Sequence, residues 1–197
     1  MKVPYPVARL LASIAENAAS ERGVPMAIAV TDAEGGLLLF GRMDGALPAS
    51  TELAVSKAFT AAVLRMPTDE LGELAQPGGI LYGIEQSHQG RIVLFGGGLP
   101  LWLWGQVAGA IGISGGSVEQ DMMVARVAVE ALEQMEQWAD FTAAHVPSGP
   151  AAVASPLNEL EKMLRDELKK AGQALSNRDA ALVVGAMLLA QARGRRE

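Results

Sequence analysis

GGGLPLWLWGQVAGAIGISGG, residues 96–116, is the most informative segment of this 197-residue chain. It combines three consecutive glycines, a proline, two of the three tryptophans and a second series of glycines. Glycine has no Cβ and tolerates positive φ, so Gly96 to Gly98 can form a tight turn whose amides face a ligand, another strand or another subunit. Larger and smaller residues alternate over 107–114, which predicts a strand with one face pressed against a closely packed element. Close packing alone would explain these glycines, and a ligand site is the functional alternative.

The first fifty residues predict a helix followed by a β-hairpin. Apolar residues recur at three- to four-residue steps across 6–22, and Gly23 follows where a helix C-cap would lie. Two short apolar runs, 26–31 and 36–42, flank the turn-forming segment 32–36. This composition favours two strands joined by a tight turn.

Two further helices and a strand are expected before the glycine-rich segment. Ser50 is a candidate N-cap for a helix that carries Lys57, and Thr68 is a candidate N-cap for a short helix with two carboxylates in its first turn. Residues 76–89 are glycine-rich and irregular, and the apolar run 91–95 predicts a strand that leads into the triple glycine.

A long helix is expected after the strand over 107–114. Ser117 and Gln120 fit a capping box, and apolar residues recur at helical spacing from there to 138–141. The order of these elements predicts an α/β (α+β) sandwich with a central antiparallel sheet flanked by helices.

Proline and glycine at 147–150 predict a boundary between a domain of residues 1–149 and a helical appendage of residues 150–197. The acidic excess lies in the first part, whereas the appendage carries more basic than acidic residues. Two helix starts, the first at Ser155, predict a C-terminal helical hairpin. Its second helix, 180–192, is apolar on nearly all sides, so we expect it to pack on its own domain, a second copy or a partner.

Composition excludes several classes of function. The net charge of −6 argues against nucleic-acid binding, and the chain has no cysteine for disulfides or thiolate ligation of a metal or haem. We find no uninterrupted apolar run long enough to cross a membrane and no basic leader, which predicts a cytoplasmic protein. Half of the residues are hydrophobic, which is compatible with surface buried in a homo-oligomer.

Several motifs resemble the GlcG/HbpS-like haem-binding family, a domain that also forms the C-terminal half of PduO-type proteins of propanediol-utilisation microcompartments. The GGxPL turn and GAIGxSGG strand of that family appear as Gly97–Leu101 and Gly109–Gly116. Its R-M-D-G segment and K-A-x-T-A helix appear as Arg42–Gly45 and Lys57–Ala61. The resemblance covers roughly residues 3–146 and implies a profilin-like fold and assembly as a homo-oligomer.

The resemblance implies haem as the cofactor, with propionates near basic side chains and an axial ligand from a neighbouring loop. Arg42 and Lys57 are the candidate basic pair for these carboxylates or for a small organic acid, and an ion-pair network that includes Asp44 is the structural alternative. The candidate cofactor-binding residues are Arg42, Lys57, His88, Gly97, Gly98 and Pro100.

His88 is the candidate ligand of the haem iron, and His145 is the only other histidine. The resemblance implies a histidine ligand in the N-terminal region, whereas residues 1–50 contain none. Met122, Met123 and Met135 are better explained as core or interface residues than as iron ligands.

Three functional hypotheses follow. The first is a haem-binding accessory protein of a cobalamin- or diol-related metabolic module, associated with a bacterial microcompartment. The second is a non-catalytic oligomeric assembly protein that has lost haem binding. The third is an enzyme that binds a small carboxylate through Arg42 and Lys57, which is weakest because the sequence shows no nucleophile–base pair, phosphate loop or metal-ligand cluster. Residues 150–197 are a candidate docking segment for a microcompartment or enzyme partner.

Overall fold

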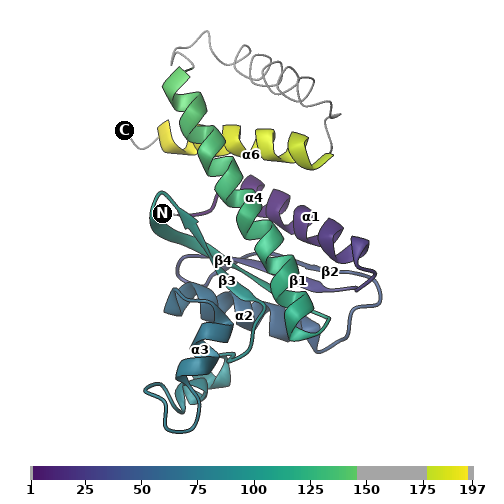
Figure 1. Ribbon diagram of the computed structural model, residues 1–197, viewed down its shortest axis with the longest axis vertical. Coiled ribbons are helices and arrows are strands. Elements are labelled where there is room, and N and C mark those ends of the chain that lie inside the picture. The colour runs from purple at the N-terminus through teal and green to yellow at the C-terminus, as the bar shows by residue number, and fades with distance from the viewer. Residues whose placement is uncertain (1, 146–176, 195–197) are drawn as a thin grey trace. The chain divides into compact units, whose positions relative to one another are not determined.

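The computed structural model describes residues 2–145 and 177–194 (Figure 1). The chain divides into two compact units, Met1–Glu130 and Ala131–Glu197. The elements are α1 (Tyr5–Glu21), β1 (Ala27–Asp32), β2 (Leu37–Arg42), α2 (Ser50–Leu64), α3 (Thr68–Leu74), the 3₁₀ turns η1 (Ile84–Gln86) and η2 (His88–Gly90), β3 (Gly98–Leu103), β4 (Gln106–Ser114), α4 (Val118–His145) and α6 (Asn177–Gly194).

The first unit is built on a four-stranded antiparallel sheet in the order β2-β1-β4-β3. β1 and β4 are the two central strands, and their register pairs Ile28 with Ile113 and Val30 with Ile111. Figure 1 shows α2 on one face of this sheet and α1 with the first part of α4 on the other. The predicted sandwich, an antiparallel sheet flanked by helices, is therefore confirmed.

Small residues let α2 lie very close to the sheet. On β4, Ala110 is fully buried against α2, and a Cβ added to Gly112 would collide with the backbone oxygen of Ala54. On the helix side the contacts are also alanines, among them the fully buried Ala58. The predicted close packing against one face of residues 107–114 is confirmed, and its cause is the alternation of small and large residues.

The opposite face of the sheet carries the larger aliphatic side chains. Ile28, Val30, Ile111 and Ile113 are all fully buried. They alternate with the small residues that face α2, because successive side chains of a strand point to opposite faces. The amphipathic helix α1, which packs against β1 and β2, buries eight side chains that include Val7, Leu11 and Ile14.

Three expectations about local structure are wrong. Residues 91–95 form no strand: the run is buried at Ile92 and Val93, but the Val93 amide donates to Thr60 Oγ1 of α2 at 3.0 Å instead of to a neighbouring strand. A short apolar run cannot distinguish a strand from a buried loop.

The turn of the β3–β4 hairpin also lies later than expected. Gly98 already belongs to β3, and the turn is formed at Trp104 and Gly105.

The two predicted N-caps are the third expectation that is wrong. The N-cap residues are Ala49 for α2 and Pro67 for α3, and neither makes a side-chain capping bond. Ser50 and Thr68 are instead the first helical residues, both buried. The Thr68 hydroxyl is bonded to the backbone of Gly98 instead of capping the helix.

In the second unit, α6 confirms the expected helix over 180–192. Its Val183 is buried in a cluster with Trp138 and Met187, and a Cβ on Gly185 would collide with the sulfur of Met135. The first helix of the predicted hairpin and the boundary at 147–150 lie outside the described residues. None of the described helices is both long enough and apolar enough to cross a membrane.

Candidate functional site

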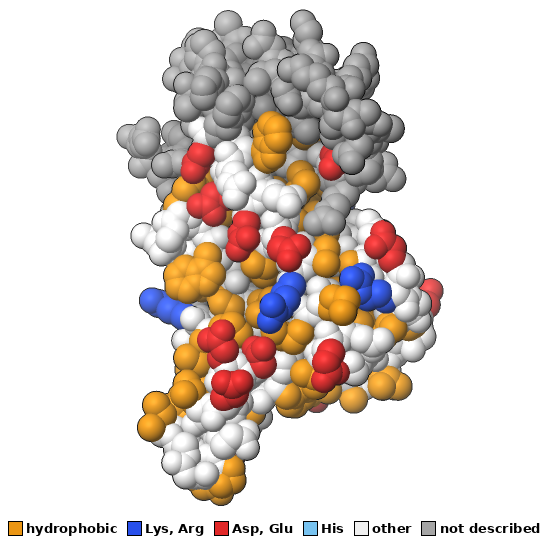
Figure 2. Space-filling model, in the orientation of Figure 1, with side chains coloured by type: hydrophobic (Ala, Val, Ile, Leu, Met, Phe, Trp, Pro, Cys, Tyr) orange, Lys and Arg blue, Asp and Glu red, His pale blue; other side chains and the backbone are white. Residues whose placement is uncertain are grey.

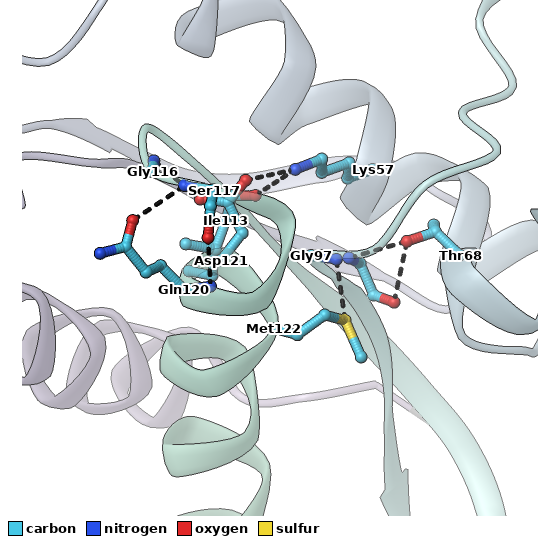
Figure 3. Close-up of polar contacts among 10 residues, drawn as sticks. Lys57, Thr68, Gly97, Ile113, Gly116, Ser117, Gln120, Asp121 and Met122 are labelled. Carbon is cyan, nitrogen blue, oxygen red and sulfur yellow. Dashed lines mark hydrogen bonds and ion pairs between the residues drawn. The ribbon is translucent and has the colours of Figure 1, made fainter.

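The glycine-rich segment is held by hydrogen bonds from three directions (Figure 3). The Gly97 carbonyl accepts from the Ile113 amide at 2.8 Å, and the Gly97 amide donates to the sulfur of Met122 at 2.9 Å. The Gly98 amide donates to Thr68 Oγ1 at 3.0 Å, and the same hydroxyl lies 3.4 Å from the Gly98 carbonyl. These amides therefore serve the protein's own strands and helices.

Lys57 lies directly beneath this segment. Its side chain is fully buried, and its ammonium donates to Asp121 Oδ2 at 2.6 Å and to the Ile113 carbonyl at 2.9 Å. The ammonium also lies 4.9 Å from the centroid of the Phe95 ring. Burial lowers the pKa of Lys57 below its usual value because removal from water outweighs the opposing effect of Asp121.

Asp121 connects the ion pair to the start of α4. Its Oδ2 binds Lys57 while its Oδ1 accepts from the Gly116 amide at 3.0 Å. The predicted capping box is confirmed beside it, since the Ser117 amide donates to Gln120 Oε1 at 2.9 Å and the Gln120 amide donates to Ser117 Oγ at 3.3 Å. An acidic side chain here is also favoured by the positive end of the helix dipole.

The close approach of Lys57 explains the need for glycine at position 97. Gly97 has a φ of 117°, and an added Cβ would lie 2.6 Å from both Lys57 Nζ and the Ile113 carbonyl oxygen. A side chain at this position would therefore displace the ion pair as well as strain the backbone.

The candidate cofactor-binding residues named from the sequence lie in separate parts of the domain. Lys57, Gly97 and Gly98 lie together, but the Lys57 ammonium is occupied by Asp121 and Ile113. Arg42 is exposed at the end of the edge strand β2.

Pro100 lies in the edge strand β3, paired with Ala110. The amide of Gly98 points away from β4 toward Thr68, so the Pro100 nitrogen two residues later points away as well. An edge strand tolerates proline at such a position because no ladder bond is lost.

His88 belongs to a different cluster that sequence reasoning missed. Its exposed ring packs edge-on against Phe59 of α2, with ring centroids 5.6 Å apart, and Arg91 stacks over the same Phe59 ring with Cζ 3.9 Å from the centroid. The His88 Nδ1 lies 3.1 Å from Ser87 Oγ. We call His88, Arg91 and Phe59 the Phe59 platform.

The backbone that carries His88 is strained. His88 and Gln89 adopt consecutive left-handed conformations, with φ of 51° and 61°. Each costs about 1–2 kcal/mol for a residue with a side chain. Arg65 at the end of α2 and Trp104 in the β3–β4 turn also have positive φ, but His88 and Gln89 are the two adjacent non-glycine residues among those with this conformation.

Neither Asp121 nor the Phe59 platform is signalled strongly by the sequence. A lysine within the apolar segment of α2 indicates a buried partner, but not which acid supplies it. Within the parts of the chain that the structure describes, no cluster of three or more histidine, aspartate or glutamate side chains is arranged to hold a metal ion.

The sheet, its two helical layers and the glycine-rich segment over a buried ion pair define a small mixed α/β domain. The chain belongs to the HbpS-like family, whose model is described as a haem-degrading protein and matches residues 4–130. The first unit of the structure ends at the same residue, Glu130.

Several known proteins are similar to this chain. An uncharacterised 15.0 kDa protein of Citrobacter freundii, encoded between dhaT and dhaS, is 44% identical over 128 residues, which cover 65% of this chain and 90% of that protein. The corrinoid adenosyltransferase PduO of Citrobacter freundii is 48% identical over 58% of this chain, but the match spans only 34% of PduO. The solved structure of a PduOC:haem complex is 42% identical, with a TM-score of 0.64 over 66% of this chain and 94% of that one.

Proposed function

We propose that this chain binds haem and that His88 supplies a ligand to the iron. The observation that carries the proposal is the likeness to the PduOC:haem complex, which extends over nearly the whole of that chain. Membership of a family described as haem-degrading agrees with it. When bound, haem would supply an iron centre whose properties depend on its axial ligand and surroundings.

The chemistry of His88 fits such a ligand. Its Nδ1 is engaged by Ser87, which leaves Nε2 with no hydrogen-bond partner among the described residues. A hydrogen bond on one imidazole nitrogen orients the ring and directs the other nitrogen toward a metal. The ring packs edge-on against Phe59, and the exposed position of His88 gives a large planar ligand access.

The buried ion pair takes a supporting part in this proposal. Lys57 and Phe59 lie two residues apart on α2, so the bond from Lys57 to Asp121 fixes the helix that carries the platform. We therefore assign Lys57, Gly97 and Gly98 to positioning rather than to contact with the ligand. Arg42 lies on an edge strand and stays a candidate for a separate carboxylate contact.

Titration with haemin tests the proposal. We expect a saturable shift of the Soret band, and no comparable spectral change with metal-free protoporphyrin, because the proposed ligand acts on iron. A titration that merely reproduces the spectrum of free haemin would refute the proposal.

The cellular setting that we propose is cobalamin- or diol-related metabolism, in the cytoplasm and within a bacterial microcompartment. Similarity to PduO supports this setting, although the chain spans about a third of that protein. We assign residues 150–197 to docking on a partner. Removal of these residues should abolish co-sedimentation with microcompartments, and unchanged co-sedimentation would refute the assignment.

An assembly role is a second candidate, favoured by exposed apolar side chains on the segment between α3 and β3. Ile80 and Tyr82 are 86% and 66% exposed there. Figure 2 shows acidic and basic side chains interspersed on the visible face, with no continuous basic patch in the described part of that face. We propose that the apolar pair contributes to a homo-oligomer, so serine at both positions should reduce the mass measured by light scattering, and an unchanged mass would contradict this role.

A further inference from the structure

We infer that Arg91 binds a carboxylate of the ligand held by His88, an inference that rests on the proposed haem binding. Arg91 and His88 share one support. Arg91 Cζ lies 3.9 Å from the centroid of the Phe59 ring, and the His88 ring meets the same Phe59 edge-on, with centroids 5.6 Å apart. The two side chains therefore place an imidazole and a guanidinium against one ring.

The charge of Arg91 is not neutralised within the described structure. The ion pairs Lys2–Asp32 and Lys57–Asp121 do not involve Arg91. This half-buried guanidinium is a cation that has no carboxylate partner among the residues that the structure describes. Lys57, the other basic candidate on this side of the sheet, already has its carboxylate in Asp121.

Stacking prepares the guanidinium for an anionic group. Arg91 Cζ lies 3.9 Å from the centroid of the Phe59 ring, a cation–π contact that holds the guanidinium in place. The N–H donors of a guanidinium form a rigid fork that matches the two oxygens of a carboxylate. Because the orientation is already fixed by the ring, little additional freedom is lost when a carboxylate binds.

The backbone of residues 88–90 sets the positions of His88 and Arg91 relative to each other. Between them lie Gln89 and Gly90, both with positive φ, of 61° and 78°. With His88 at 51°, three consecutive residues adopt this conformation, and two of them are not glycine. This geometry reverses the chain between His88 and Arg91 and so brings both side chains to the Phe59 ring.

The iron of haem can bind an imidazole, and its peripheral carboxylates can bind a guanidinium. Esterification removes the charge of the carboxylates and leaves the iron unchanged. We therefore compare haemin with haemin dimethyl ester on the full-length protein. The wild type should bind haemin about tenfold more tightly than the ester, a difference typical of one well-placed charged hydrogen bond. Arg91→Gln should lose this preference while keeping the Soret position set by His88.

Two further variants make the result specific. Arg9→Gln removes an exposed arginine on α1 and should leave the preference for haemin unchanged. Arg91→Lys keeps the charge without the flat fork and should retain only part of the preference, which also guards against misfolding of Arg91→Gln. If both Arg91 variants discriminate haemin from its ester as the wild type does, the assignment of Arg91 is wrong although haem binding stands. If the wild type shows no Soret change with either compound, the proposed function fails and this inference fails with it.

Discussion

The ammonium of Lys57 lies 2.6 Å from the carboxylate of Asp121, with the two side chains 0% and 4% exposed. The pair joins α2 to the first turn of α4, and it closes around the backbone of Ile113 and Gly116. Taking two charges out of water is costly, and their attraction offsets this cost only while both partners are present. The pair therefore fixes the arrangement of α2, β4 and α4 more than it adds to stability.

Removal of one partner should be more harmful than removal of both charges. Lys57→Met leaves Asp121 buried without its cation, which should cost about 3–5 kcal/mol. Combining it with Asp121→Asn removes both charges and keeps an amide oxygen for the Gly116 amide, so much of the loss should be recovered. Urea unfolding of the wild type, both single variants and the double variant measures this coupling, and strictly additive losses would contradict it.

The pKa of Lys57 predicts a pH dependence with a definite sign. Burial places its pKa in the folded protein below the usual 10.5, which the unfolded chain retains. Between these two values the unfolded state holds a proton that the folded state has lost, so the free energy of unfolding rises with pH, by at most about 1.4 kcal/mol per unit. Below the folded-state pKa both states are protonated and the contribution is constant.

Comparison with the double variant Lys57→Met/Asp121→Asn isolates this contribution, because it removes both buried charges while the other groups titrate in both proteins. The difference in unfolding free energy between wild type and variant, measured by urea unfolding from neutral pH to pH 10.5, should grow in favour of the wild type. A difference that stays constant or shrinks as the pH rises would be inconsistent with a lowered pKa.

Alanine at position 97 should be much more harmful than alanine at position 105. Both glycines have positive φ, 117° and 72°, so both substitutions strain the backbone, by about 1–2 kcal/mol. Only at Gly97 would the added Cβ meet Lys57 and Ile113, whereas nothing lies within 4 Å at Gly105. We expect an additional loss of about 1–3 kcal/mol for Gly97→Ala. Equal shifts of the urea midpoint would show that the ion pair does not require the close approach.

The hydroxyl of Thr68 should matter more than its methyl group. It accepts from the buried amide of Gly98, so Thr68→Val leaves that amide unpaired at a cost of about 1–3 kcal/mol. Thr68→Ser keeps the hydroxyl and serves as the matched control. Thermal unfolding of the two variants distinguishes the roles, and a serine variant no more stable than the valine variant would argue against this hydrogen bond.

The sequence was sufficient for the parts of the fold that depend on local patterns. The 3.6-residue repeat predicted α1, alternation predicted β4, and the capping box at Ser117 predicted the start of α4. Residues 91–95 were wrongly expected to form a strand, because a buried loop and a strand can share the same apolar composition. Thr68 was wrongly expected to cap α3, because its hydroxyl makes a tertiary hydrogen bond to Gly98 instead.

The candidate site was less predictable because its contacts are distant in sequence. Lys57 and Asp121 are 64 residues apart, and no local pattern of either segment encodes their pairing. Phe59 and Arg91 meet only because the loop before β3 folds back along α2. The motif residues Gly97 and Gly98 could be recognised, but the structure was needed to show that Lys57 beneath them is already paired.

A haemin titration of the wild type, His88→Ala and His145→Ala, followed in the Soret region, tests directly whether His88 holds the iron. His145 is the only other histidine, so its variant is the matched control. We predict that the wild type and His145→Ala give the same saturable Soret shift, and that His88→Ala loses this shift and binds haemin more weakly. An unchanged Soret position and affinity in His88→Ala would contradict the proposal that His88 holds the iron.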